Sequence, residues 1–216
     1  MKPIRFIVYS DYLCPWCYNA SVRLRSIEAE YAGVVELDWR SYLLRPQLRT
    51  HADPAAALEK FRRYTESWLR PAGETESGEF QVWSTAEGPP SHSIPAHLVS
   101  KAAKRLGEAA FSAMHDRLLR AYFGENRDIS REETLRALWD ELELDPDGFE
   151  VSRDPALLDE VMAEHNEALE CGATGVPAVR LDGNPAVIVG AHPVELYRRW
   201  IERSLARTSE PNASAP

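Results

Sequence analysis

The chain has 216 residues, of which 44% are hydrophobic, and it carries a formal net charge of −9 at pH 7. This length suffices for one sizeable hydrophobic core, and one domain is more common at this size than two. The acidic balance argues against nucleic acid and against an anionic membrane surface as partners, because both are bound by clustered Lys and Arg.

The first residues contain only a short apolar run, which Arg5 interrupts and Asp11 follows. The apolar region of a secretory signal, about 7–15 residues long, is therefore missing, and no stretch reaches the roughly 18 apolar residues of a membrane span. We expect a cytoplasmic protein. In a reducing compartment three cysteines do not predict a disulfide framework, and a close pair is typical of catalysis or metal binding.

A strand, a helix and a second strand are predicted at the start of the chain. Residues 4–9 form a short apolar run rich in β-branched and aromatic side chains, which is typical of a buried strand. A helical pattern begins at Pro15 and stops at Gly33, and residues 34–40 then alternate between apolar and charged side chains. This order predicts a βαβ unit with parallel strands.

The middle of the chain is predicted to be largely helical. Helical spacing is found over residues 54–70, 94–106, 108–123, 130–141 and 155–171. Ser130 with Glu133 predicts a capping box, and Asp154 before Pro155 predicts an N-cap.

After Cys171 the strand character returns. Residues 176–181 and 186–189 are predicted to form a hairpin, and residues 193–205 a final helix. The predicted order is thus βαβ, a helical block, then ββα, which is an α/β fold. We expect residues 1–45 and 172–207 to form one discontinuous domain, residues 46–171 to form a helical insert, and residues 208–216 to be a disordered tail.

Cys14-Pro15-Trp16-Cys17 lies directly after the first predicted strand, at the start of the first helix. A thiol at this end of a helix faces unpaired backbone N–H groups and the positive end of the helix dipole, and both stabilise a thiolate. Pro15 suits the first helical position, where no N–H is needed. A CxxC at the strand-to-helix turn of a βαβ unit predicts a redox pair, with Cys14 as the attacking thiol and Cys17 as the shielded, resolving thiol.

Two other interpretations of the pair were weighed. A structural zinc site needs four ligands, typically a second close pair of Cys or His. Cys171 is solitary, and His92 and His97 lie much further along the chain than the second ligand pair of a compact zinc finger. We therefore expect no metal ion. The remaining interpretation is a pair of buried, inert thiols.

Several segments together resemble the DsbA family of thiol–disulfide oxidoreductases. They are Cys14-Pro15-Trp16-Cys17-Tyr18, Ala96-His97, Arg120-Ala121-Tyr122-Phe123, Gly172-Ala173-Thr174-Gly175-Val176-Pro177 and Gly190-Ala191-His192-Pro193. The resemblance covers nearly the whole chain and is closest to the cytoplasmic FrnE-like branch. It implies a thioredoxin fold with an all-helical insert, disulfide exchange with protein or small-molecule thiols, and no cofactor, and it allows a homodimer. Ser91-His92-Ser93 departs from the family, because an Asn is expected there.

The resemblance also implies roles for residues around the cysteines. In thioredoxin-like proteins the proline that begins the strand facing the CxxC has a cis peptide bond, here Val176–Pro177, and the adjoining backbone binds an extended substrate. An ordinary trans proline at the first residue of a strand is the alternative. Pro15 and Trp16 are expected to border the substrate, and His97 either to contact substrate or to pack between helices. Cys171 is either a third, regulatory thiol or inert.

Two further activities stay open. The same superfamily contains 2-hydroxychromene-2-carboxylate isomerases and kappa-class glutathione transferases, which carry serine at the position of Cys14 and activate glutathione. The presence of both Cys14 and Cys17 favours disulfide exchange, with glutathione binding as the alternative. A chaperone-like binding protein is the third hypothesis, and it would keep its function when Cys14 is replaced by Ser.

Overall fold

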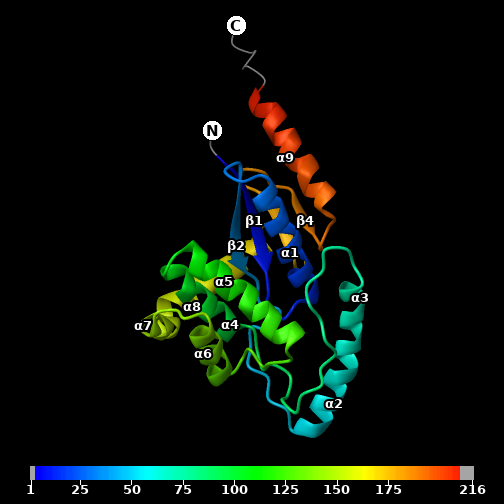
Figure 1. The fold of residues 1–216 in the computed structure, drawn as a ribbon, viewed down its shortest axis with the longest axis vertical. Helices are drawn as coiled ribbons and strands as arrows, with labels where there is room; N and C mark the ends of the chain where they lie inside the picture. Colours follow the sequence, from blue (N-terminus) through cyan, green and yellow to red (C-terminus); the bar gives the residue numbers. More distant parts are fainter. Residues whose placement is uncertain (1–2, 210–216) are drawn as a thin grey trace.

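The computed structural model describes residues 3–209, and its centre is a four-stranded sheet in the order β2-β1-β3-β4 (Figure 1). The strands are β1 (Ile4–Ser10), β2 (Val35–Ser41), β3 (Ala178–Leu181) and β4 (Val187–Val189). β1 pairs with β2 in parallel, and β3 pairs antiparallel with both β1 and β4. The predicted βαβ opening and the C-terminal hairpin are both confirmed.

Helices cover both faces of this sheet. On one face, α1 (Pro15–Glu30) and α9 (Val194–Ser209) pack on Phe6 and Val8 of β1. On the other face, Ile7 and Tyr9 pack against residues at the end of α8 (Pro155–Glu170). Burial on both faces explains why β1 is an unbroken apolar run rather than an alternating one.

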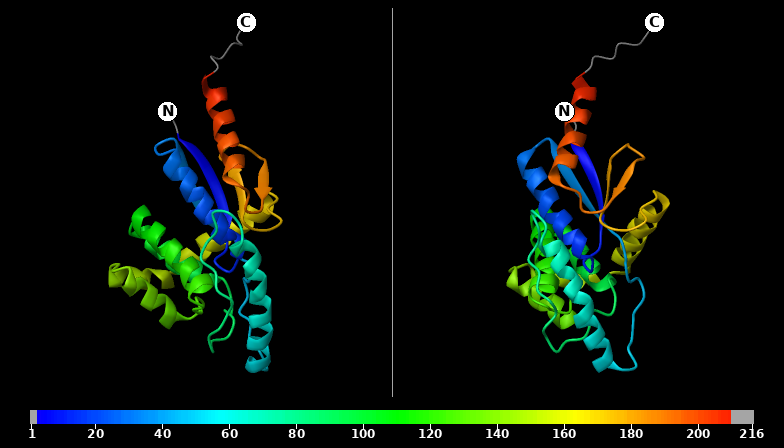
Figure 2. Two further views of the ribbon diagram at one scale, coloured as in Figure 1. Left: turned by 45° about the vertical axis from the view of Figure 1, so that its right-hand side comes forward. Right: turned by 90° about the vertical axis from the view of Figure 1, so that its right-hand side faces the viewer.

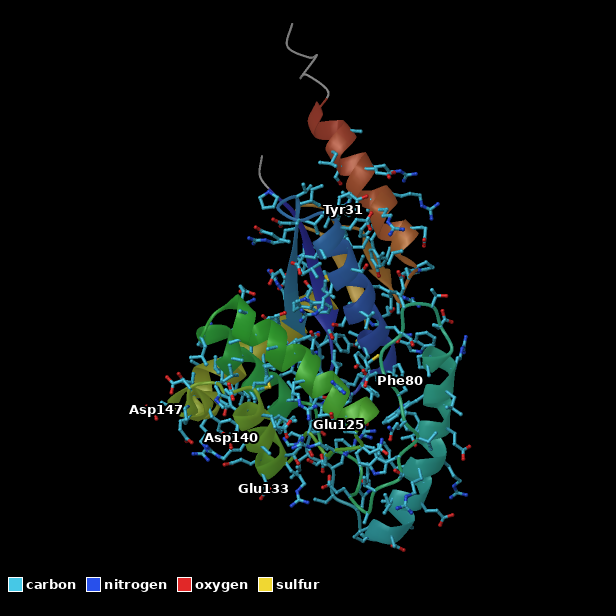
Figure 3. All side chains as sticks on the ribbon, in the orientation of Figure 1. Tyr31, Phe80, Glu125, Glu133, Asp140 and Asp147 are labelled. Atoms are coloured by element: carbon cyan, nitrogen blue, oxygen red, sulfur yellow. The ribbon has the colours of Figure 1, made fainter. Side chains whose placement is uncertain are left out.

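The remaining helices form a second half of the molecule with its own apolar core. They are α2 (Pro54–Thr65), α3 (Leu69–Ala72), α4 (Ile94–Arg105), α5 (Glu108–Leu119), α6 (Glu132–Glu141) and α7 (Pro146–Glu150). The core contains Trp68, Tyr122, Phe123 and Trp139, all almost fully buried. Acidic side chains such as Asp140 and Asp147 face outward (Figure 3).

Helices α2 and α3 run along one side of the molecule, and the segment that follows them returns toward α4 (Figure 2). Trp83 on this segment donates its backbone N–H to Thr65 Oγ1 of α2 at 3.0 Å. This hydrogen bond ties the irregular segment between α3 and α4 to α2. None of the helices within residues 3–209 is long and apolar enough to cross a membrane.

Several element ends differ from the sequence predictions. The helix expected over residues 54–70 ends at Thr65, and a 3₁₀ turn and the short α3 follow it. The predicted capping box is wrong: Arg131 is the N-cap residue of α6, and Ser130 Oγ instead donates to Asp128 Oδ1 at 2.6 Å. The Asp154 N-cap is confirmed by its bond from the Ala156 N–H.

Two further differences concern the helices near the C-terminus of the chain. The short helix α7 was not predicted, because its five residues are too few to show a helical period. The last helix continues to Ser209, beyond its predicted end at residue 205 and into the expected tail. The rest of that tail, residues 210–216, lies outside the described residues.

Gly78 lies against Tyr18 of α1, and its N–H donates to Asn19 Oδ1 at 3.1 Å. A Cβ at position 78 would lie 2.3 Å from Tyr18 Cδ1, and the Tyr18 ring is itself stacked on Phe123. We expect Gly78→Ala to lower the free energy of unfolding by about 1–3 kcal/mol in urea, because the ring or the backbone must shift.

Gly88→Ala is the matched control, since a Cβ at Gly88 has nothing within 4 Å. It should change the free energy of unfolding by less than about 0.5 kcal/mol. Equal losses in Gly78→Ala and Gly88→Ala would contradict the steric explanation.

Candidate active site

Cys14 lies where β1 leads into α1. It is the N-cap residue of α1 with an extended backbone (φ −99°, ψ 115°), and Pro15 opens the helix. The Cys14 side chain forms no capping hydrogen bond with the first turn of the helix. The positive end of the helix dipole nevertheless lies beside Cys14.

The segment before β3 lies directly opposite this thiol. The Val176–Pro177 peptide bond is cis, and Cys14 Sγ donates to Val176 O at 3.3 Å. Pro177 O in turn accepts the Gly190 N–H at 2.8 Å from beyond β4. Two segments that are 162 residues apart in sequence thus meet at one sulfur atom.

The two thiols of the CxxC differ in their surroundings. Cys14 is 6% exposed and Cys17 is fully buried, and both are free thiols. The pKa of Cys17 is raised well above its usual range, mainly by burial and next by the contact with Cys14. Hydrogen bonds from the Asp11 backbone and the Ser10 side chain act to lower that pKa. Cys17 is therefore the more shielded of the two thiols, and its burial favours the protonated form.

Asp11 connects the CxxC turn to its surroundings. It is fully buried, its Oδ1 accepts the Leu13 N–H and its Oδ2 accepts the Leu44 N–H, each at 2.6 Å. Burial raises the pKa of this carboxyl group, and hydrogen bonds from Ser93, Leu44 and Leu13 counteract the rise. One carboxylate therefore links the turn before α1, the loop after β2 and the residue that precedes α4. The sequence analysis did not identify this role.

The family model of the DSBA-like thioredoxin domain matches residues 5–202 of the chain. The protein belongs to this family. No curated protein sequence matches the chain.

Three solved structures illustrate how far the similarity of this DSBA-like protein extends. A probable DsbA oxidoreductase from Streptomyces coelicolor is 25% identical, with a TM-score of 0.74, over 99% of this chain and 94% of that chain. The cytosolic disulfide reductase DsbM from Pseudomonas aeruginosa is 22% identical, with a TM-score of 0.72, over 94% of this chain and 99% of that chain. A 2-hydroxychromene-2-carboxylate isomerase is 17% identical, with a TM-score of 0.64, over 98% and 100%. These structures share the thioredoxin-like fold with a helical half.

Of the other residues singled out from the sequence, Pro15 and Trp16 border the thiols of this DSBA-like site. Trp16 is partly exposed, and Arg70 Cζ of α3 lies 5.7 Å over its ring. Cys171 is partly exposed at the C-terminal end of α8, where its Sγ donates to Ala168 O at 3.2 Å. Within residues 3–209, no group of three or more His, Cys, Asp or Glu is arranged to hold a metal ion.

His97 lies in the interior of the molecule. It is 4% exposed and packs on Tyr12, with ring centroids 4.9 Å apart. Burial is the main cause that lowers the pKa of His97 to about 3, with the nearby Lys101 ammonium second. His97 is therefore a neutral, buried imidazole of the helical half.

A buried polar cluster surrounds Tyr12, between α1, α4 and α5. Tyr12 Oη donates to Ser100 Oγ at 2.6 Å and contacts His115 Nδ1 at 3.1 Å. His115 Nε2 contacts Ser21 Oγ at 3.0 Å, and burial lowers the pKa of His115 well below its usual range. Sequence reasoning missed this cluster because its members come from separate segments that show only helical spacing.

The difference in burial predicts selective alkylation. In the reduced native protein, iodoacetamide should modify Cys14 and Cys171 but not Cys17, because Cys17 is buried and its raised pKa leaves little thiolate. Peptide mass spectrometry after a short reaction at neutral pH measures the labelling of each thiol. Urea-denatured protein is the control and should be labelled at all three cysteines. Equal rates at Cys14 and Cys17 in the native protein would contradict the assigned roles.

Asp11→Ala should lower the free energy of unfolding by about 2–4 kcal/mol, because the Leu13 and Leu44 N–H groups lose their acceptor in the interior. Asp11→Asn keeps one carbonyl oxygen and should cost less. Urea unfolding followed by circular dichroism gives both values. Asp140→Ala, at an exposed position of α6, is the control and should stay within about 0.5 kcal/mol. A loss at Asp11 no larger than the loss at Asp140 would refute this role.

Proposed function

We propose that the protein is a thiol–disulfide oxidoreductase that exchanges disulfides with protein or small-molecule thiols through Cys14 and Cys17. The observation that carries the proposal is the asymmetry of the pair: Cys14 is the N-cap residue of α1 and its Sγ lies 3.3 Å from Val176 O, while Cys17 is fully buried. Two-step exchange needs one thiol that reaches the substrate and a second that is protected until the mixed disulfide forms.

The chemistry consists of two displacements. In the first, the Cys14 thiolate attacks one sulfur of a substrate disulfide, and the other substrate sulfur leaves as a thiolate. In the second, the Cys17 thiolate attacks Cys14 Sγ and the second substrate thiolate leaves. The protein ends with a Cys14–Cys17 disulfide and the substrate is reduced; the reverse sequence oxidises a dithiol. No cofactor takes part.

The surroundings of Cys14 fit an extended substrate. The Val176 carbonyl next to the sulfur is a hydrogen-bond acceptor for a substrate backbone N–H, once the substrate displaces the thiol proton from it. Val176 and Trp16 are partly exposed, whereas Pro15 and Pro177 fix the backbone on each side. We assign these four residues to substrate binding, and His97 to an internal role.

The similarity to DsbM adds a candidate substrate and a compartment. DsbM is described as a cytosolic disulfide reductase, and one of its structures contains GSH. We propose the cytoplasm as the compartment and glutathione as one small thiol that reacts at Cys14.

An equilibrium titration in glutathione redox buffers, read by alkylation and mass spectrometry, tests this function. Wild-type protein should show one reversible two-electron transition between the dithiol and a Cys14–Cys17 disulfide. Cys14→Ser should abolish both the transition and disulfide exchange, and Cys17→Ser should accumulate a glutathione adduct on Cys14. Cys171→Ser, the control, should leave the transition unchanged. A wild-type protein that forms only a glutathione adduct would instead support glutathione binding, and activity that survives in Cys14→Ser would support a chaperone-like role.

A further inference from the structure

Each exchange cycle requires Cys17 to lose a proton and later to regain one, yet Cys17 is fully buried. Among residues 3–209, the groups hydrogen-bonded near its sulfur include Cys14, the backbone N–H of Asp11 and the side chain of Ser10. The Asp11 carboxylate oxygens accept the Leu13 and Leu44 N–H groups instead. A backbone N–H can only donate, whereas a hydroxyl both accepts and donates, so the Ser10 hydroxyl is the group through which the Cys17 proton can leave.

Ser10 also lines a small cavity between the sheet and the helical half. Other polar residues of its wall include Ser41 of β2 and His97, Ser100 and Lys101 of α4. The space in which the centre of a water molecule can lie has a volume of about 10 Å³. That volume is close to the lower limit of about 10–15 Å³ for a single buried water.

Two atoms of the cavity wall point to a bound ligand. Ser41 Oγ and His97 Nε2 are buried and have no hydrogen-bond partner among the residues that the structure describes. His97 donates its other ring N–H to the Tyr42 carbonyl, so that Nε2 of the neutral ring is an acceptor. Buried polar atoms without partners are costly, and a water molecule between them would satisfy both.

Lys101 connects the cavity wall to the surface. Its side chain is 4% exposed, and Nζ is ion-paired with Glu160 and Glu164 of α8, whose side chains are 29% and 16% exposed. Glu164 also accepts the N–H of Ser41 at 2.7 Å. A route of polar groups therefore runs from Cys17 through Ser10 and the cavity to carboxylates that reach solvent.

We propose that this cavity binds one water molecule, held by Ser41 and His97, which relays the proton between Cys17 and the Lys101–Glu164 pair. The proposal rests on the proposed disulfide exchange. Cys17 passes its proton to Ser10 Oγ while Ser10 passes its own proton to the water. The Cys17 thiolate then forms a bond to Cys14 Sγ, and the electron pair of the broken Cys14–substrate bond leaves on the substrate sulfur. The water gives its extra proton to Lys101 as Lys101 releases one to Glu164, which exchanges with solvent.

Reduced Cys171→Ser protein mixed with 5,5′-dithiobis(2-nitrobenzoate) separates the two displacements, because the partly exposed third thiol is then absent. Attack by Cys14 releases one coloured thiolate, and attack by Cys17 on the mixed disulfide releases the second. Stopped-flow absorbance records both phases, and the variants below are made in this same background. In the Cys171→Ser protein the second phase should show a larger solvent deuterium isotope effect than the first, because only resolution moves a proton along the relay.

Ser41→Val fills the cavity with methyl groups and should slow the second phase by about 10- to 100-fold, up to the lower end of the range of proton-transfer catalysis, while the first phase changes by less than about twofold. Ser41→Ala leaves room for water and should slow it far less. His97→Leu should also slow the second phase, and His97→Gln, which restores a polar atom near the position of Nε2, should recover part of the rate. His165→Leu is the matched control: His165 is a buried histidine of α8 outside the cavity wall.

The outcomes are distinct. A normal second phase in Ser41→Val and His97→Leu overturns the relay, as does equal slowing of both phases, which would mark a structural defect. Should these variants fail to fold, an isotope effect on the second phase of the Cys171→Ser protein no larger than on the first overturns it. Release of only one thiolate by the Cys171→Ser protein, without a Cys14–Cys17 disulfide, contradicts the proposed function itself.

Discussion

The antiparallel pairing of β1 with β3 is the constraint on which the rest of the site depends. Its register places Tyr9 opposite Ala178, so the two residues before β3 come to the end of β1 where the CxxC begins. A slip of one residue would turn every side chain of β3 to the opposite face. Val179 would then leave the core under α1 and α9, which it shares with Phe6 and Val8. Packing of one apolar layer therefore fixes the position of Val176 O beside Cys14 Sγ.

The sequence was informative where a function depends on neighbours in the chain. The apolar run of β1, the cysteines at the start of α1 and the hairpin before α9 are local signals, and each predicted element is found in the structure. The Ser130 capping box failed because its hydroxyl oxygen accepts the Ser91 N–H at 2.9 Å, while the hydroxyl proton is donated to Asp128. A local pattern therefore predicts a helix cap correctly only when no other group forms hydrogen bonds with the same hydroxyl.

The polar interior was not predictable in the same way. Asp11 follows a strand, where an aspartate is ordinary, and only the structure shows that its carboxylate accepts the N–H groups of Leu13 and Leu44. His97 occupies a helical position that is equally compatible with the surface and with the interior. Its burial depends on Tyr12 and Tyr42, residues of other segments, so no spacing within α4 reveals it.

The helical half has a second physical effect on the thiol pair. The sheet and α1 by themselves present Cys14 and shield Cys17, but α4 and α5 cover Ser10 and Ser41 at the ends of the two parallel strands. Burying hydroxyl and imidazole groups without partners is unfavourable, and an apolar wall would pack at lower cost. The helices instead supply His97 and Lys101 at this position, next to Ser10, which contacts Cys17. Packing alone would favour apolar side chains in this wall over polar ones. The polar wall is therefore explained by its hydrogen bonds, which serve the proposed chemistry of Cys17.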